Sequence, residues 1–552
     1  MKRLFIFTLI TLSLLSAVSY SAPFQSQNMV LSSQSEEANW AGLQIAKSGG
    51  NIADVAVATA LALAVSHPQS GSLGGGGFAM IKVGDKVEAL DFRETAPSSF
   101  TPSFYKDKAK DASINGPYAV GVPGVIAGLY AIHKKHGKLK WAQLFEPAIE
   151  LAEKGIRINR DMVEALASNF SRLNDRGREL FLDEDKKQKL PGDYFKQPAL
   201  ANALKLIKEK GSDGFYKGEV AKDIVETITS LKGVITEKDL ADYEVRWLEP
   251  IVTDYEGHKV YLMPPPSSGG VVIASALKLT ELRKTKDFPA LSALEYHLFG
   301  EILSRSFRGR VHLGDPDFHK NPVDYLLSNE TIKELANTIN YGEAVTLAPL
   351  KEIPGAEKKE STETTHYTVM DKLGNAISIT TTLNGNFGSG LFSHNFGISL
   401  NNEMDDFTTR PDEPNMFGLI QGEGNIVQPQ KRPLSSMSPT IVTKDGKAVL
   451  ALGARGGPRI ISAVFQALYR VLVSGFNLDE ALQAGRVHHQ FLPNKLMVDP
   501  RRFSPDVIKA LKEKGHDVVE DDVAKLSAVH RTEAGILESA FDSRGNGSAI
   551  GY

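Results

Sequence analysis

Apolar residues recur with helical spacing near the start of the chain and then with alternate spacing. Residues 36–46 follow Ser35 and stop before a glycine pair, so a capped start and a glycine stop predict a helix. Residues 51–65 are rich in alanine and apolar nearly all round, which predicts a second, buried helix. Strands are predicted at 79–83 and 88–94. The glycine run before the first strand lacks a following Lys-Ser or Lys-Thr, so it predicts a tight turn beside a crowded centre and not a phosphate loop.

The middle of the chain, from Gly121 to about Leu335, has mostly helical spacing, with a polar break near 187–197. Further on, short strands are predicted at Gly397–Leu400 and Ile441–Val442, and a helix is predicted over Ile460–Val473. No internal repeat, coiled coil or low-complexity tract interrupts these segments.

A β-hairpin is predicted directly after a charged segment. Residues 351–363 (KEIPGAEKKESTE) carry almost no large apolar groups, which predicts an exposed and mobile stretch. Residues 364–370 and 375–383 then alternate between apolar and polar, and turn-forming residues lie between them. If residue 370 pairs with residue 375, Thr364 lies across from about Thr381, with Thr382 next to it.

Composition excludes several classes of function. The 552 residues are 42% hydrophobic and 23% charged, which is typical of a folded globular protein. The net charge of −3 and the absence of a basic block argue against nucleic-acid binding. No cysteine is present, so disulfides, thiolate zinc sites and a cysteine nucleophile are excluded.

The first residues are typical of a secretory signal peptide. Lys2 and Arg3 precede the apolar stretch 4–18, and small residues follow, so cleavage is expected after Ser19 or Ser21. The alternative is an uncleaved membrane anchor. We expect a leader at 1–21 and a periplasmic or secreted protein.

The known catalytic motifs are mostly missing. There is no HExxH, no Cys/His cluster and no Gly-x-Ser-x-Gly elbow, so no metal site is predicted. Ser103–Lys106 matches Ser-x-x-Lys, but the Lys-Ser-Gly at 47–49 lies before it, in the wrong order for a penicillin-binding enzyme.

The strongest chemical candidate is the hydroxyl-rich junction at residues 361–368. A threonine is a poor nucleophile unless a base takes its proton, and a free α-amine on the same residue can do so. Such an amine at Thr364 requires cleavage of the chain just before it. The alternative is a surface loop that enters an ordinary threonine-rich strand.

Three later clusters carry further polar groups. Residues 401–407 bring acids and amides together, and residues 431–440 place hydroxyls on a turn. Each cluster alone is also compatible with a capped turn. Residues 453–458 place paired glycines before a helix, where backbone N–H groups suit a developing oxyanion.

In their order and spacing, these motifs resemble the γ-glutamyltranspeptidases across nearly the whole mature chain. The motifs are Gly74–Phe78, Asp91–Glu94, Thr364–Tyr367, Thr382–Asn384, Asn401–Phe407, Arg432–Thr440 and Gly456–Gly457. The resemblance implies an α/β N-terminal-nucleophile hydrolase fold, a four-layer αββα sandwich. It also implies self-cleavage between Glu363 and Thr364 into a large subunit (22–363) and a small subunit (364–552) that stay together as a heterodimer.

The resemblance also implies roles for individual residues. Thr364 would be the nucleophile with its own amine as base, Thr382 would hold that amine, and Gly456 and Gly457 would donate to the oxyanion. Six side chains would bind the free amino-acid head of the substrate: Arg93, Ser435 and Ser436 its α-carboxylate, and Asn384, Glu403 and Asp406 its α-ammonium. The sequence departs from many bacterial relatives at Phe417, where a lid tyrosine is common; phenylalanine cannot offer a hydroxyl to Asn384.

The implied activity is transfer of a γ-glutamyl group from glutathione or a related compound to water or to an acceptor amino acid or peptide, without metal or cofactor. Three alternatives remain. One is an amidase of the same fold, similar to a cephalosporin acylase or a poly-γ-glutamate-processing enzyme. The others are a periplasmic amino-acid-binding protein without catalysis and a serine amidase using Ser435 or Ser436.

Overall fold

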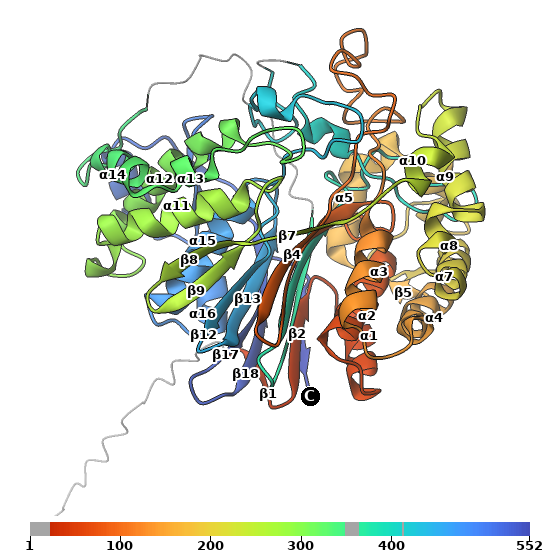
Figure 1. The fold of residues 1–552 in the computed structure, drawn as a ribbon, viewed down its shortest axis with the longest axis horizontal. Helices are drawn as coiled ribbons and strands as arrows, with labels where there is room; N and C mark the ends of the chain where they lie inside the picture. Colours follow the sequence, from red (N-terminus) through yellow and green to blue (C-terminus); the bar gives the residue numbers. More distant parts are fainter. Residues whose placement is uncertain (1–21, 348–363, 411–412) are drawn as a thin grey trace, which may run out of the picture.

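The computed structural model describes residues 22–347, 364–410 and 413–552 (Figure 1). The predicted leader at 1–21, the charged segment at 351–363 and the expected cleavage residue Glu363 lie outside the described residues. Within the described part of the chain, no helix is long and apolar enough to cross a membrane.

Two antiparallel sheets lie face to face at the centre of the molecule, and helices cover their outer faces (Figure 1). This arrangement confirms the predicted four-layer αββα sandwich of an α/β protein. Within the described residues, the first sheet has the strand order β19 (Ser548–Gly551), β2 (Met29–Ser33), β10 (Thr365–Asp371), β11 (Ala376–Thr382), β3 (Gly76–Val83), β4 (Lys86–Phe92) and β7 (Arg246–Leu248). The second has the order β1 (Phe24–Ser26), β18 (Leu537–Phe541), β17 (Lys525–Arg531), β13 (Lys447–Arg455), β12 (Thr440–Lys444), β9 (His258–Leu262) and β8 (Ile251–Tyr255).

One helical layer lies on the side of the first sheet and the other on the side of the second (Figure 1). The first layer contains α1 (Glu36–Lys47), α2 (Ile52–Ser66), α3 (Val125–His136), α4 (Glu146–Lys154), α5 (Arg160–Asn169), α7 (Pro198–Lys210), α8 (Asp213–Tyr216), α9 (Glu219–Ser230) and α10 (Glu237–Ala241). The second contains α11 (Gly269–Leu282), α12 (Ala293–Arg308), α13 (Val323–Leu326), α14 (Asn329–Asn337), α15 (Arg459–Leu472) and α16 (Leu478–Gln483). Smaller elements complete the described chain: α6 (Asp175–Leu180), α17 (Pro505–Glu513), β5 (Ile156–Arg157), β6 (Tyr194–Phe195), β14 (Val487–His488), β15 (Leu496–Val498) and β16 (Val518–Glu520).

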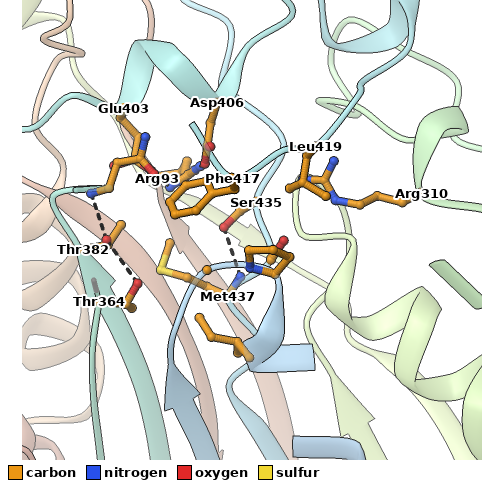
Figure 2. A pocket seen from close by; sticks show the side chains of 15 residues that line it. Arg93, Arg310, Thr364, Thr382, Glu403, Asp406, Phe417, Leu419, Ser435 and Met437 are labelled. Carbon is orange, nitrogen blue, oxygen red and sulfur yellow. Dashed lines mark hydrogen bonds and ion pairs between the residues drawn. The ribbon is translucent and has the colours of Figure 1, made fainter. Parts of the chain in front are cut away.

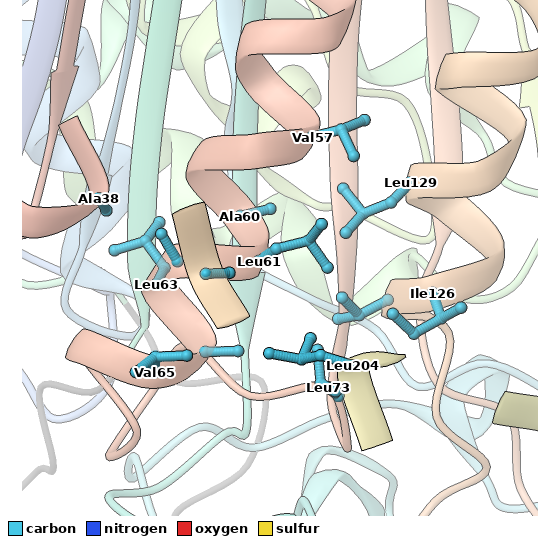
Figure 3. Packing of buried hydrophobic residues seen from close by; sticks show 14 of the residues in the cluster. Ala38, Val57, Ala60, Leu61, Leu63, Val65, Leu73, Ile126, Leu129 and Leu204 are labelled. Atoms are coloured by element: carbon cyan, nitrogen blue, oxygen red, sulfur yellow. The ribbon is translucent and has the colours of Figure 1, made fainter. Parts of the chain in front are cut away.

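The central strands are apolar on both faces because each face is covered. Side chains alternate along a strand, so Ala79 and Ile81 of β3 join the core under the first helical layer. Phe78 and Met80 join the core between the sheets. Figure 3 shows the helical side, where residues of α2 such as Leu61 lie close to α3. Because α2 is enclosed on all sides, it is buried over its whole length, as its apolar composition predicts.

The early elements are confirmed to within three residues. Helix α1 begins at Glu36, and the Ser35 side chain accepts a hydrogen bond from the Ala38 N–H (3.2 Å). Helices α2 and α15, and strands β4 and β12, also occur where they are predicted.

The prediction that Gly121 to Leu335 is mostly helical is confirmed by α3 to α14, but residues 246–262 form β7, β8 and β9 instead. Strands β7 and β8 are the outermost strands of their sheets. The side chains of β7 are half-buried, and β8 buries Thr253 while it exposes Val252, so the apolar contrast that marks a strand is weak there. The strand predicted at Gly397–Leu400 is also wrong. Ser399 and Leu400 form only isolated bridges, each to a different segment, so no ladder develops.

The glycine run is correctly predicted to lie at a crowded place, but it does not form a tight turn. Gly76 begins β3, and none of the four glycines has a positive φ. A Cβ atom at Gly75 would lie 2.0 Å from the Thr382 carbonyl oxygen, and one at Gly74 would lie 2.2 Å from the Ser399 carbonyl oxygen. Glycine is required here for close backbone approach.

The predicted hairpin is confirmed with a register shifted by one residue. Met370 pairs with Ala376, not with Asn375. The turn lies at residues 372–375 instead of 371–374, and within it the Asp371 carboxylate accepts hydrogen bonds from the Leu373 N–H (2.9 Å) and the Asn375 N–H (3.0 Å). Thr365 therefore pairs with Thr381.

Candidate active site

Four central strands of the first sheet end at the same edge and place the predicted residues in a row. The register that pairs Thr365 with Thr381 puts Thr364 across from Thr382. Thr382 pairs with Gly76, and the next residue of β3 pairs with the last residue of β4. Arg93 directly follows β4. The strand ladder alone therefore aligns Thr364, Thr382, Gly76 and Arg93.

A pocket opens beside this row, and its walls come from the strand ends of the first sheet, from loops and from the start of helix α15 (Figure 2). It encloses about 300 Å³, including its open mouth. Its predicted lining residues are Arg93, Thr364, Thr382, Asn384, Glu403, Asp406, Ser435, Ser436 and Gly457. Gly456 was also predicted for the site, but it does not line the pocket; it precedes Gly457 in the chain. Within the described residues, no group of three or more His, Asp or Glu side chains is arranged to hold a metal ion.

Two threonine hydroxyls meet at the base of the pocket. The Oγ1 atoms of Thr364 and Thr382 lie 3.3 Å apart, and both residues are buried (Figure 2). The Thr382 hydroxyl also accepts a hydrogen bond from the Asn384 N–H (2.9 Å). Asn384 has a φ of 73°, so the chain turns sharply after β11 and brings the Asn384 side chain into the same pocket.

A buried ionic cluster forms the opposite end of the pocket. Arg93 donates from Nη1 to the Glu403 carboxylate and from Nη2 to Asp406 Oδ2 (2.5 Å). Its Nε donates to the Pro433 carbonyl oxygen (3.2 Å), and the Glu94 carboxylate lies 3.8 Å from Nη1. The cluster therefore presents both signs of charge at one place.

Burial governs ionisation in this cluster. It raises the pKa of Asp406 and Glu403 above the usual values, although Arg93 opposes the rise for both. Burial raises the pKa of Glu94 to about 8, again against the effect of Arg93. The Glu94 carboxylate has no hydrogen-bond partner among the described residues, which fits a carboxyl group that stays protonated at neutral pH.

A proline-rich loop supports the serine wall. The Ser435 N–H donates to the Pro266 carbonyl oxygen (2.7 Å), and the Ser268 N–H donates to the Ser435 carbonyl oxygen (2.8 Å). The Ser435 hydroxyl accepts from the Met437 N–H (3.1 Å). Both Ser435 and Ser436 are buried at the pocket surface.

Paired glycines directly precede helix α15, as predicted. Gly456 and Gly457 have φ values of 138° and 56°, which favour glycine. Their carbonyl oxygens accept hydrogen bonds from the N–H groups of Arg459 and Ile460. There is also no room for a side chain at Gly457, because a Cβ atom there would lie 2.9 Å from the Phe417 ring. The structure thus places Phe417 over the pocket against the glycine turn.

Sequence reasoning missed several lining residues: Arg310, Leu419, Met437, Pro458 and Ile460. Arg310 is the one with a charge. It lies in a 3-10 turn (Gly309–His312) directly after α12, inside the stretch predicted only as helical. No sequence motif includes Arg310. The only available signal is that a charged residue directly follows a buried helix.

Comparison with known proteins identifies relatives over nearly the whole chain. Residues 38–552 match the family model described as gamma-glutamyltranspeptidase. A curated protein named "Glutathione hydrolase proenzyme" from Pseudomonas sp. (strain A14) is 41% identical over 503 residues, covering 90% of this chain and 87% of that protein. One of the same name from Escherichia coli (strain K12) is 39% identical over 534 residues, covering 95% and 91%.

Solved structures share the fold. The cephalosporin acylase from Bacillus halodurans has a TM-score of 0.85 at 25% identity and covers 99% of both chains. The Helicobacter pylori gamma-glutamyltranspeptidase has a TM-score of 0.54 at 37% identity, covering 55% of this chain and 90% of that chain. These neighbours confirm the expected N-terminal-nucleophile hydrolase fold.

Proposed function

Because the chain belongs to the gamma-glutamyltranspeptidase family, we propose that it is made as one precursor, cleaves itself between Glu363 and Thr364, and then transfers γ-glutamyl groups from glutathione. The chain is an enzyme of this family. The proposed subunits are 22–363 and 364–552, which remain together as a heterodimer. The word "proenzyme" in the names of relatives that are about 40% identical supports this processing.

One observation carries the proposal: the hydroxyl pair of Thr364 and Thr382 shares a pocket with a buried cluster of both charge signs. A γ-glutamyl group has the matching shape. Its amino-acid head is a zwitterion, and its reactive amide lies at the far end of the side chain. The head would bind the charged end of the pocket and so present the γ-carbonyl to Thr364.

In the proposed reaction, cleavage frees the α-amine of Thr364, whose ordinary pKa of about 7.7–8.0 suits a general base. The amine, held by the Thr382 hydroxyl, takes the proton of Thr364 Oγ1. Oγ1 then bonds to the γ-carbon, the amide C–N bond breaks, and the proton passes to the leaving amine. The resulting γ-glutamyl ester is released by water as glutamate, or by the amine of an acceptor amino acid or peptide as a new γ-glutamyl amide.

Two sets of backbone and side-chain groups complete the proposed site. The N–H groups of Gly456 and Gly457 stabilise the oxyanion of the tetrahedral intermediate. The head of the substrate is bound by six side chains: Arg93, Ser435 and Ser436 at the α-carboxylate, and Asn384, Glu403 and Asp406 at the α-ammonium. A guanidinium and two hydroxyls can bind a carboxylate through charge-assisted hydrogen bonds. The scheme uses no metal or organic cofactor.

We also propose that the protein is exported to the periplasm or secreted after removal of the leader at 1–21. This proposal rests on the positive start, the apolar stretch and the small residues that follow it.

The first test is the intact mass of the purified protein with N-terminal sequencing of its fragments. We expect a small chain that begins Thr364-Thr365-His366 and ends at Tyr552. Turnover of a γ-glutamyl anilide should accompany it. Donor turnover by a single uncut chain would exclude the amine base and with it the mechanism.

The same purified protein can be used to test the three alternative functions. A cephalosporin acylase activity predicts faster turnover of glutaryl-cephalosporin than of γ-glutamyl anilide. The 39–41% identity to proteins named glutathione hydrolase, against 25% to the acylase, favours the γ-glutamyl donor. An amino-acid-binding protein would stay uncut and bind ligand reversibly. A serine amidase would lose covalent labelling in Ser435→Ala or Ser436→Ala.

A further inference from the structure

The pocket contains a second buried guanidinium that the proposed reaction does not use. Arg310 is 3% exposed and lines the pocket together with Arg93 and Asp406. Figure 2 shows its side chain reaching towards Leu419 on the side of the pocket opposite Thr364. Its charge therefore lies behind the head of a bound γ-glutamyl group, away from the reacting amide.

Arg310 and Arg93 differ in their partners. Both Nη atoms of Arg93 contact carboxylates. Among the described residues, no carboxylate oxygen lies within 4 Å of Arg310, and its Nε has no hydrogen-bond partner. Burying a cation without a paired anion is costly, so a function is expected of it.

Among the described residues, Arg310 forms a side-chain hydrogen bond only with Gln421, and Gln421 in turn bonds to Asp406. Arg310 Nη1 donates to Gln421 Oε1 (3.0 Å), and Gln421 Nε2 donates to the Asp406 carbonyl oxygen (2.5 Å). Asn425 Nδ2 donates both to Gln421 Oε1 (2.9 Å) and to the Asp406 carbonyl oxygen (2.6 Å). Two donors thus fix which way the Gln421 amide points, and that amide fixes the backbone of Asp406.

Charge supports the same connection. Burial lowers the pKa of Arg310 to about 10, Asp406 opposes this change, and Arg93 adds to it. Arg310 therefore stays cationic at neutral pH and is close enough to feel both groups. In turn it is one of the charges that oppose the burial-driven rise in the pKa of Asp406.

We propose that Arg310 is a positioning residue for the α-ammonium of the substrate, acting through Gln421 on Asp406. This inference rests on the proposed function, in which Asp406 receives that ammonium. It makes selectivity for the amino group depend on a residue almost a hundred positions away in the sequence, outside every motif of the small subunit.

The test uses binding and kinetics of the processed enzyme. L-Glutamate carries both head groups, glutarate lacks the ammonium, and 4-aminobutyrate lacks the α-carboxylate. In Arg310→Met, we expect about tenfold weaker binding of L-glutamate and 4-aminobutyrate by calorimetry, with glutarate changed less than about twofold. With γ-glutamyl anilide, KM should rise by a similar factor while kcat stays nearly constant, because the lost interaction is present equally in ground and transition states.

Matched variants isolate the connection. Gln421→Ala should reproduce part of the loss, the double variant should be no worse than Arg310→Met, and Arg310→Lys should recover part of the binding. Arg308→Met removes a neighbouring arginine that lines a different cavity and should leave all three ligands unaffected. If Arg310→Met does not fold, Gln421→Ala and Arg310→Lys decide.

Equal weakening of all three ligands, or unchanged binding of L-glutamate, would overturn the inference. These results are distinct from failure of the proposed function. A wild-type enzyme that binds L-glutamate but turns over no γ-glutamyl donor would contradict the function, while the binding comparison would still decide the role of Arg310.

Discussion

The two walls of the pocket are built by different means. The strand wall, formed by Thr364, Thr382 and Arg93, stands at the ends of β10, β11 and β4, where the backbone ladder sets each position. The loop wall, formed by residues 402–406, 415–421 and 435–437, has no strand of its own. It is held by side-chain hydrogen bonds to other segments and, at Ser435, by backbone hydrogen bonds to Pro266 and Ser268.

The loop wall is consequently an interdependent network. The Asp405 carboxylate accepts from the Ser113 hydroxyl (2.7 Å) and from the Met416 N–H (2.8 Å). The Asn402 side chain accepts from the Gly385 N–H (2.8 Å). We infer that a substitution on the strand wall removes chemistry and leaves the geometry in place, whereas one on the loop wall also disturbs its neighbours.

Thr364→Ala should have the largest effect and the smallest structural cost. Without the hydroxyl there is no nucleophile, so we expect an uncut chain and a loss of donor turnover of about 10⁴-fold or more. The thermal midpoint should be close to that of the wild-type precursor, because the ladder and not this side chain holds β10. Intact mass, γ-glutamyl anilide turnover and calorimetry measure the three quantities.

Thr365→Val is the matched control. Thr365 is the adjacent residue, and its buried hydroxyl has no partner among the described residues. Processing and turnover should therefore persist. A cleaved, active Thr364→Ala protein would show that the strand wall does not carry the nucleophile.

Arg93→Met affects both walls, because Arg93 lies on the strand wall and forms ion pairs with Glu403 and Asp406 of the loop wall. Removing it leaves two buried carboxylates without their cation. We expect the free energy of unfolding to fall by about 3–5 kcal/mol, and KM for the donor to rise about 100-fold because the α-carboxylate loses its charged partner. Denaturant unfolding and steady-state kinetics measure these effects.

The control for this variant is Arg246→Met. Arg246 forms ion pairs with Asp91, Asp315 and Asp317 outside the pocket. The Arg246→Met variant should therefore be less stable than wild type, without a comparable rise in KM. If both variants raised KM equally, the effect of Arg93 would be structural and the proposed carboxylate contact would be wrong.

The same difference between the walls explains what the sequence could predict. The alternation around Thr364 and Thr382 predicts a hairpin, and a short turn sets its register to within one residue. The remaining error of one residue lies in the turn, where the Asp371 carboxylate accepts hydrogen bonds from the backbone N–H groups of Leu373 and Asn375. Local spacing is sufficient there because the partners are near in the chain.

The loop wall lacks such local information. Arg310 contacts Gln421, and through it the backbone of Asp406, only because α12, of the second helical layer, ends beside a distant loop of the chain. The family motifs predicted Glu403, Asp406, Ser435 and Ser436, but their spacing does not reveal which distant side chains hold them. The partly exposed outer strands β7 and β8 were missed for a related reason, since their apolar pattern is weak.

A pH experiment tests the ionisation of Glu94, which follows Arg93 in the chain. Burial raises the pKa of Glu94 to about 8 from an ordinary 4.5. Between these values the folded state holds a proton that the unfolded state has lost. Through this group, the free energy of unfolding falls by about 1.4 kcal/mol for each pH unit between about 4.5 and 8. Glu94→Gln removes this dependence. The thermal midpoint of this variant should therefore rise relative to that of wild type as the pH rises.

Glu88→Gln, in strand β4, provides a control of opposite sign. Although burial raises the pKa of Glu88, hydrogen bonds from Lys135 and Lys86 outweigh it and leave the pKa lowered. Its charged form stabilises the fold above its ordinary pKa, so this variant should lose stability there. Parallel curves for Glu94→Gln and wild type would mean that Glu94 is ionised.

The smallest effect is expected on the loop wall, at Phe417→Tyr. The Asn384 amide, which a tyrosine hydroxyl would have to bind, already donates to the Asn402 carbonyl oxygen (3.1 Å). The ring packs against Gly457, and this contact does not need a hydroxyl. We expect donor kcat/KM to change by about threefold or less, whereas Phe417→Ala, which uncovers the pocket, should lose about tenfold. A much larger gain in Phe417→Tyr would show that the covering loop lacks a latch in the wild type, and that the loop wall is held less firmly than its hydrogen bonds indicate.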